Sequence, residues 1–220
     1  MGILSGLLDL LYPPKCPFCG SAGRSENGKG CPNCREAAFW LPLEDRVVSG
    51  ENYARCVCVG SYEDPLRLSV RRFKFQGRRE YAGEYGEAMA DAVRLFLPGA
   101  YEAITWMPVS EKRLKERGYD QARLMAEAMA ERLDKPAMPL LEKIRDNPAQ
   151  SSLKDGRDRK RNVDGVYRVP DPVAVEGRRI LLVDDILTTG ATLEEGARTL
   201  RAAGAQQVVA AVLCRTPEKH

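Results

Sequence analysis

The sequence predicts an α/β fold, in which a mainly parallel sheet is flanked by helices and preceded by a small four-cysteine domain. Two observations lead to this prediction. From residue 53 onward, short apolar runs alternate with long helical patterns, as in strands joined by crossover helices. Before residue 53, two Cys-x-x-Cys pairs stand in a glycine-rich stretch with few apolar residues. We therefore expect an N-terminal helix and zinc-ribbon-like domain over residues 1–52 and a second domain over residues 53–220.

The composition narrows the classes of function. A hydrophobic share of 44% and a charged share of 30% are ordinary for a soluble globular protein, and the sequence has no transmembrane run and no convincing signal peptide. We predict a cytoplasmic protein, and the sequence indicates no oligomeric state. The net charge of +3 is too weak to imply nucleic acid by itself. The sole histidine is His220, which argues against a histidine general base and against a Cys-His hydrolase.

The N-terminal segment begins with leucines at helical spacing over residues 3–12, followed by Pro13-Pro14. This pattern predicts a short amphipathic helix that packs on the body of the protein. A membrane-surface anchor is the alternative. The absence of flanking lysine or arginine argues against a membrane-surface anchor.

The cysteine pairs predict a metal centre. Cys16 and Cys19 form one Cys-x-x-Cys turn, Cys31 and Cys34 form another, and eleven residues separate them. Two such turns complete a closed tetrahedral sulfur shell that suits Zn²⁺. A closed shell leaves no position for substrate, so we expect a structural zinc. The minor alternative is a rubredoxin-like iron site. The alternative without a metal is that the four cysteines are separate core side chains.

The rest of the chain alternates between the two kinds of element. Residues 35–52 have the composition of a connector. We predict strands at 56–59, 103–109, 140–145, 166–169, 180–183 and 207–214, and helices at 62–75, 78–97, 121–133 and 193–203. Cys56 and Cys58 share one face of a strand and are expected to be core side chains rather than extra metal ligands. The polar, basic residues 146–164 have the composition of a mobile loop or a solvated helix rather than of core.

The apolar run 180–183 is expected to be a buried strand that stops at Asp184 and Asp185. After it come five residues that are small or hydroxylated and that precede a helical pattern: Thr188, Thr189, Gly190, Ala191 and Thr192. A short loop entering a helix can bind a phosphate through backbone N–H groups, and the threonine hydroxyls add donors. Carboxylates can accept hydrogen bonds from sugar hydroxyls or help to position Mg²⁺. The combination predicts a site for a phosphorylated ribose.

This stretch has three alternative interpretations. One is an ordinary strand-turn-helix with a capping threonine. A Walker A loop is excluded because the Gly-Lys-Ser/Thr sequence is absent. A response-regulator acid pocket would stand near the start of its domain, whereas Asp184 and Asp185 stand near the end of the chain.

The stretch 180–193 resembles the phosphoribosyl diphosphate (PRPP) signature of type I phosphoribosyltransferases, and the whole chain resembles the competence protein F (ComF) family. Beyond the signature and the cysteine turns, the resemblance rests on Phe73-Lys74-Phe75, Met107-Pro108-Val109 with Arg113, Arg117-Gly118-Tyr119-Asp120-Gln121, Gln150-Ser151 with Leu153, and Arg161-Asn162. The family usually has Phe-Asn where this chain has Tyr119-Asp120. The departure puts an extra carboxylate beside the expected site.

The resemblance implies the type I phosphoribosyltransferase fold and the displacement of pyrophosphate from ribose by an acceptor, with Mg²⁺ bridging pyrophosphate and the ribose hydroxyls. By position, Asp184 and Asp185 are the catalytic acids that hold the ribose, and residues 188–192 hold the 5′-phosphate. Ser110 and Arg113 face pyrophosphate. The segment 150–162 acts as a lid through Gln150, Arg157 and Arg161.

The acceptor cannot be read from the sequence, and three hypotheses follow. The chain is a pentosyl-transferring glycosyltransferase of nucleotide metabolism, or a module that binds PRPP or a ribonucleotide without catalysis. Alternatively, it is a zinc-containing accessory of DNA uptake and competence that binds single-stranded DNA or DNA-uptake proteins. For the last, the candidates for a basic surface are Arg71, Arg72, Lys74, Arg78 and Arg79, and a solvated helix face is the favoured alternative for these residues.

Overall fold

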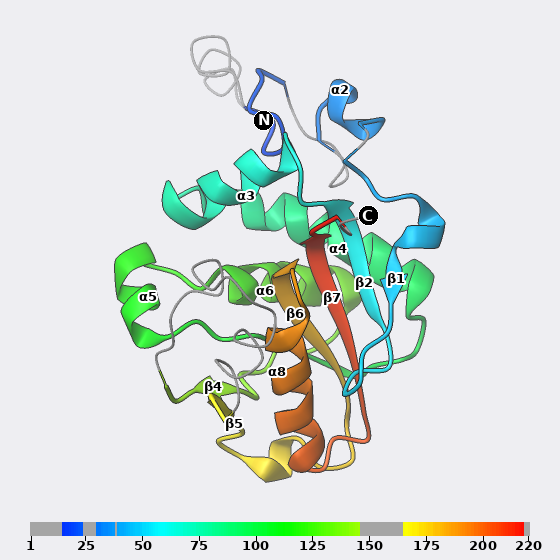
Figure 1. Cartoon of the computed structure of the whole chain (residues 1–220), viewed down its shortest axis with the longest axis vertical. Coiled ribbons are helices and arrows are strands. Elements are labelled where there is room, and N and C mark those ends of the chain that lie inside the picture. Colours follow the sequence, from blue (N-terminus) through cyan, green and yellow to red (C-terminus); the bar gives the residue numbers. More distant parts are fainter. Residues whose placement is uncertain (1–14, 24–29, 38, 146–164, 218–220) are drawn as a thin grey trace.

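The computed structural model describes residues 15–23, 30–37, 39–145 and 165–217, and its centre is a five-stranded sheet (Figure 1). In spatial order the strands are β1 (Val47–Val48), β2 (Cys56–Ser61), β7 (Gln207–Arg215), β6 (Arg179–Leu187) and β3 (Ala103–Trp106). The strands β2, β7, β6 and β3 run parallel, and β1 is an antiparallel edge strand. The predicted mainly parallel sheet is confirmed.

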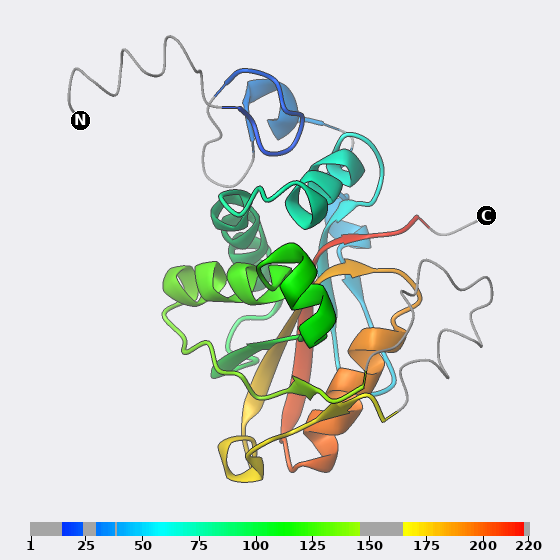
Figure 2. The same ribbon diagram turned by 90° about the vertical axis from the view of Figure 1, so that its left-hand side faces the viewer.

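Helices cover both faces of the sheet, which explains why its strands are almost continuously apolar. The helices α4 (Tyr81–Phe96) and α6 (Gln121–Leu133) lie on one face, and α8 (Ala191–Ala202) lies on the other (Figure 2). Along β6, Leu181 and Val183 join the core under α4 and α6, whereas Ile180 and Leu182 join the core under α8. Cys56 and Cys58 are buried in the second core, as expected.

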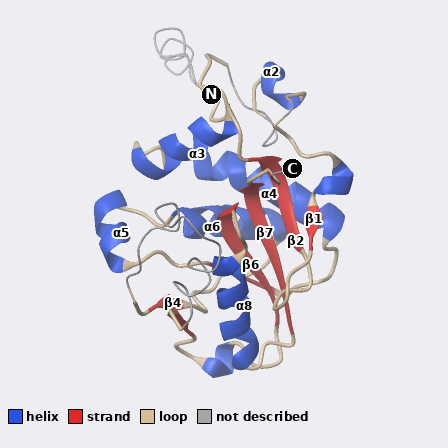
Figure 3. Cartoon of the chain, viewed as in Figure 1, coloured by secondary structure: helices blue, strands red, loops and turns tan. Residues whose placement is uncertain are grey.

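The ends of the strands and helices follow local chemistry. The helix α3 (Leu66–Phe75) begins after Pro65, not at Tyr62, because a proline disfavours helical backbone in the residue before it. The next helix, α5 (Glu111–Arg117), begins at a Ser110 cap and ends at Gly118, whose φ of 75° is left-handed. Figure 3 shows α3 beyond the carboxyl end of β6.

A second, two-stranded sheet joins β4 (Glu142–Lys143) and β5 (Tyr167–Arg168), which are shorter than predicted. A 3₁₀ helix, η3 (Pro172–Ala174), follows β5. Between β4 and β5, residues 146–164 lie outside the described part of the chain, and the expected lid residues Gln150, Arg157 and Arg161 lie with them. The predicted helix over residues 3–12 also lies outside the described residues.

The four-cysteine segment forms a small module beside α3. Its described residues include a short helix, α2 (Pro32–Arg35). The expected connector 35–52 is partly ordered: it carries the 3₁₀ helix η1 (Leu43–Asp45) and then β1, because two adjacent valines supply an edge strand for β2. Among the described residues, the helices are all too short or too polar to cross a membrane.

Candidate functional sites

The four cysteine sulfurs converge on one point. The Sγ atoms of Cys16, Cys19, Cys31 and Cys34 all lie within 4.8 Å of one another. The Cys16–Cys34 pair is 3.8 Å apart and the Cys19–Cys31 pair 3.7 Å. A tetrahedral zinc with bonds of about 2.3 Å places its sulfurs about 3.8 Å apart, so the shell fits Zn²⁺. The predicted structural zinc site is therefore supported by its own geometry.

The zinc module is held to the larger domain by an aromatic cluster. Phe18, between the first two cysteines, is fully buried. Its ring centroid lies 5.0 Å from that of Trp40 and 5.6 Å from that of Tyr85 on α4. The indole of Trp40 donates to the Cys34 carbonyl at 2.6 Å. The module thus shares a core with α4, which accounts for its fixed position.

At the second site, β6 does not stop before the acids as predicted. It continues to Leu187, because Asp184 and Ile186 still pair with Val212 and Cys214 of β7. Both carboxylates therefore stand on regular strand backbone at the carboxyl edge of the sheet. The Asp184 Oδ1 accepts from the Asp185 amide at 2.8 Å, and the Asp185 Oδ2 pairs with Lys74 Nζ at 2.7 Å.

The charged side chains at this edge of the sheet shift one another's pKa values. Burial, then the nearby Asp185 carboxylate, raises the pKa of Asp184 to about 8. Burial also raises the pKa of Asp120, and Asp185 adds to that shift. Lys74 opposes both effects at Asp184 by lowering its pKa. Three acids therefore share a confined region in which the pKa values of two are displaced, a pattern common at functional sites.

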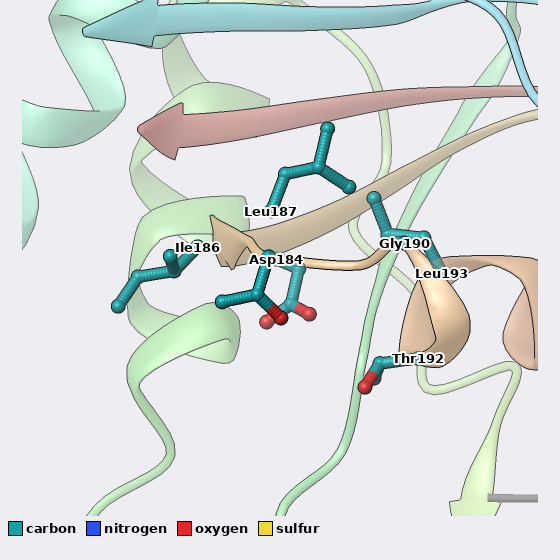
Figure 4. Close-up of a pocket in the computed structure, with 7 residues that line it drawn as sticks. Asp184, Ile186, Leu187, Gly190, Thr192 and Leu193 are labelled. Atoms are coloured by element: carbon teal, nitrogen blue, oxygen red, sulfur yellow. The ribbon is translucent and has the colours of Figure 1, made fainter. Parts of the chain in front are cut away.

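The loop after β6 turns sharply into α8. Gly190 has a φ of 78° and precedes the first residue of the helix, Ala191. A small hollow lies against this turn, lined by Asp184, Thr188, Gly190 and Thr192 among others. Figure 4 shows the Asp184 carboxylate and the Thr192 hydroxyl on the same side of the loop. A helix N-terminus and a carboxylate thus open into one hollow, the arrangement expected for a phosphorylated ribose.

Thr189 is exposed on the other flank of the same loop. There a wider hollow extends to Tyr53, Arg215 and Thr216. Glu194 in the first turn of α8 accepts from the amides of Glu51 and Asn52, each at 2.8 Å. These bonds tie the segment before β2 to the helix start, an anchor that sequence reasoning did not identify.

Ser110 and Arg113 lie at the same edge of the sheet, because β3 is parallel to β6 and Trp106 pairs with Val183. Ser110 is buried at the start of α5, and its hydroxyl accepts from the Arg113 amide at 3.4 Å. Lys74 was missed as a site residue, because Asp185 lies 111 residues away from it (185 − 74 = 111). Its place within Phe73-Lys74-Phe75 was the available signal.

The Tyr119-Asp120 departure has a local explanation. The Tyr119 hydroxyl donates to the Phe73 carbonyl. Asp120 caps α6 by accepting from the Arg123 amide, and its other oxygen accepts from the Val109 amide, both at 3.1 Å. The extra carboxylate therefore joins the strand-end loop after β3 to α6.

The comparisons with known proteins agree with this architecture. Residues 120–220 match the phosphoribosyl transferase domain family, and residues 7–45 match the double zinc ribbon domain family. The chain is 30% identical to competence protein F of Haemophilus influenzae over 200 residues, covering 87% of this chain and 82% of the relative. It belongs to the competence protein F family. The fold is thus a phosphoribosyltransferase domain preceded by a zinc ribbon.

Other relatives have names that refer to competence or to DNA utilization. Competence protein ComFC of Bacillus subtilis is 31% identical over 186 residues, covering 84% of this chain and 70% of the relative. The DNA utilization protein YhgH of Escherichia coli K12 is 30% identical over 214 residues, covering 91% and 90%. Among solved structures, a glutamine PRPP amidotransferase from B. subtilis is 22% identical with a TM-score of 0.43, covering 61% of this chain and 26% of its own.

The basic surface expected for single-stranded DNA is largely engaged in other contacts. Arg72 donates to the Phe18 carbonyl at 3.0 Å, and Lys74 pairs with Asp185. Arg79 donates to the Gly118 carbonyl at 2.7 Å, and its guanidinium lies 4.8 Å from the Tyr119 ring centroid. The other two predicted residues are exposed: Arg71 makes neither kind of contact, and Arg78 pairs with Glu80 at 3.5 Å.

Proposed function

We propose that the chain binds PRPP, or a ribonucleoside 5′-monophosphate, at the carboxyl end of β6 and transfers the phosphoribosyl group to an acceptor. The observation that carries the proposal is the convergence of the Asp184 carboxylate, the left-handed Gly190 turn and the start of α8 on one hollow. A 5′-phosphate needs several convergent donors and a ribose diol needs acceptors, and this loop supplies both.

The residues take the roles expected from their positions. Asp184 and Asp185 accept hydrogen bonds from the ribose hydroxyls, and residues 188–192 bind the 5′-phosphate. Ser110 and Arg113, after β3, face pyrophosphate. The bond between the anomeric carbon and the pyrophosphate oxygen breaks as a bond to the acceptor forms, so no nucleophilic side chain is required. That chemistry suits a chain whose sole histidine is its last residue.

Magnesium fits the proposed site, because Mg²⁺ binds through one or two carboxylates together with substrate phosphates. Asp184 and Asp185 supply those carboxylates. When bound, the ion neutralises charge on the departing pyrophosphate. The protein's own contribution is to orient the ribose against the strand end.

The names of the relatives support a role in competence or DNA utilisation, and we propose that this chain serves the same processes. A non-catalytic accessory that binds single-stranded DNA is the competing proposal. It has less support, since three of its five basic residues are held in internal contacts.

Calorimetry with PRPP, with and without Mg²⁺, tests the proposed site, and turnover with a panel of nucleobases then tests transfer. We expect PRPP to bind in the presence of Mg²⁺. For the accessory role, Arg71→Gln with Arg78→Gln should flatten the salt dependence of single-stranded DNA binding, by about 0.7 in the log–log slope for each lost contact. An unchanged slope would reject this patch, and DNA binding without PRPP binding would favour the accessory role.

A further inference from the structure

One helix, α3, contacts both the zinc module and the acids at the end of β6. In Figure 1 it lies between the zinc module and the carboxyl ends of the strands. Its side chains Ser69 and Arg72 meet the zinc module, and Lys74 meets Asp185. The two contacts are two residues apart, so a displacement of the helix at one is transmitted to the other.

On the zinc side, α3 is bound to the turn between the first two cysteines. The Ser69 hydroxyl donates to the Pro17 carbonyl and shares a hydrogen bond with the Tyr85 hydroxyl. Arg72 Nη2 donates to the carbonyl of Phe18 at 3.0 Å and to that of Pro17 at 3.4 Å. Pro17 and Phe18 stand between two metal ligands, so the sulfur shell fixes the carbonyls that hold the helix.

At its other contact, α3 places the positive charge of Lys74 next to Asp185. Lys74 Nζ lies 2.7 Å from Asp185 Oδ2, and the two side chains are only 17% and 14% exposed. Solvent screens the attraction in such a pair less than in a surface ion pair, and removing one partner leaves the other charge partly buried and unpaired. Asp185 stands beside Asp184 and near Asp120, so Lys74 is a counter-ion of an acid cluster that Arg117 also faces.

We infer that the zinc module positions Lys74 against Asp185 through α3, which makes Lys74 a positioning residue of the ribose-phosphate site. The inference rests on the proposed function. In this arrangement the ammonium group fixes the orientation of Asp185, so that its free lone pairs are presented to ribose hydroxyls. It also offsets the repulsion between the carboxylates and an incoming phosphate.

The test measures the affinity for ribose 5-phosphate without added metal, by calorimetry. Lys74→Met should weaken binding by about ten- to a hundredfold, the effect of losing one charged hydrogen bond. Lys74→Arg should restore most of it. Arg71→Met is the matched control, because it removes the same charge from the same helix at an exposed position, and it should change affinity little.

The connection through the helix is tested with Arg72→Leu, after zinc content has been shown to be normal. This variant should weaken binding by about two- to tenfold. In the Lys74→Met background it should have no further effect, because the path runs through that residue. Hydrogen exchange of residues 184–190 in the ligand-free protein should also become faster in Arg72→Leu, and not in Arg71→Met.

The outcomes are distinguishable. If the wild type binds ribose 5-phosphate and Lys74→Met binds equally well, the inference is wrong and the proposed function survives. Additive losses in the double variant would show that Arg72 acts by another route and would overturn the connection. If the wild type binds PRPP with Mg²⁺ but not ribose 5-phosphate, the same variants are compared with PRPP. If it binds neither, the proposed function fails. Unchanged hydrogen exchange in Arg72→Leu would then overturn the connection as well.

Discussion

The zinc module and the carboxyl end of β6 both gather groups that repel one another when ionised, but they relieve the repulsion differently. Four thiols lie within 4.8 Å and form a closed shell that one zinc satisfies. At the end of β6, Lys74 pairs with Asp185, while the pKa of Asp184 is raised. The first cluster is complete with its metal and stabilises the fold. The second is only partly neutralised, which costs stability and leaves carboxylate oxygens available to a ligand.

Removing one zinc ligand should have the largest effect. In Cys31→Ser we expect loss of zinc and unfolding of residues 15–45, because structural zinc contributes about 10–16 kcal/mol in isolated zinc-binding peptides. The sheet domain should stay folded by circular dichroism. Cys56→Ser, at a buried cysteine outside the shell, is the control and should keep its zinc as measured by metal analysis. Full zinc content in Cys31→Ser would contradict the assigned shell.

The next largest effect is expected at Gly190, in the loop 188–192 that is proposed to bind the 5′-phosphate. Gly190→Val should abolish ribose 5-phosphate binding, because a side chain at a φ of 78° strains the turn and obstructs the backbone's approach to phosphate. Gly177 is the matched control, since its φ is 71° and an added Cβ would meet nothing within 4 Å. Gly177→Val should be destabilised in thermal melts but bind normally. Binding losses of the same size in both variants would mean that strain alone, and not the loop, explains the effect.

Sequence patterns predicted the order of the elements and the cysteine shell well, because these depend on local periodicity and spacing. They failed where a neighbouring strand decides the outcome. The expected end of β6 at Val183 was wrong, since pairing with β7 carries the strand to Leu187. The contact between Lys74 and Asp185 was not predictable either. The contact depends on where α3 lies relative to the carboxyl end of β6, and local periodicity does not predict that position.

Removing the Asp184 carboxylate should moderately stabilise the protein, whereas Cys31→Ser and Gly190→Val are expected to destabilise it or to abolish binding. Asp184→Asn should raise the Tm of the ligand-free protein at pH 8, by about 2–4 °C for each kcal/mol gained in a domain of this size. In the folded protein the pKa of Asp184 is raised to about 8, so the folded state holds its proton more tightly than the unfolded state does. The stability of the protein is therefore highest near pH 4 with respect to this group, and it falls as the pH rises toward 8. The advantage of the variant should therefore grow over this range.

Asp185→Asn is the control for that prediction, because it also removes one carboxylate but breaks the pair with Lys74. It should show no such gain, and thermal melts from pH 4 to 8 separate the two variants. An advantage of Asp184→Asn that is constant with pH would show that the repulsion is not its cause.

The smallest effect is expected for an ion pair distant from both clusters. Asp91 and Arg94 pair at 3.1 Å on α4, with side chains about half exposed. Asp91→Asn should change the free energy of unfolding by no more than about 0.5 kcal/mol, as measured by urea denaturation, and should leave ligand binding unchanged. A loss comparable to that of a buried pair would show that exposure does not separate the two classes of charge.

The most direct test of the central claim is calorimetric titration of PRPP with Mg²⁺ into the wild type and into the Asp184→Asn, Asp185→Asn double variant. The account predicts binding to the wild type. It also predicts a loss of about ten- to a hundredfold in affinity for each charged hydrogen bond removed, with the fold retained. Equal affinity in the two proteins, or no binding by the wild type at millimolar PRPP, would contradict the placement of a phosphoribosyl site at the end of β6.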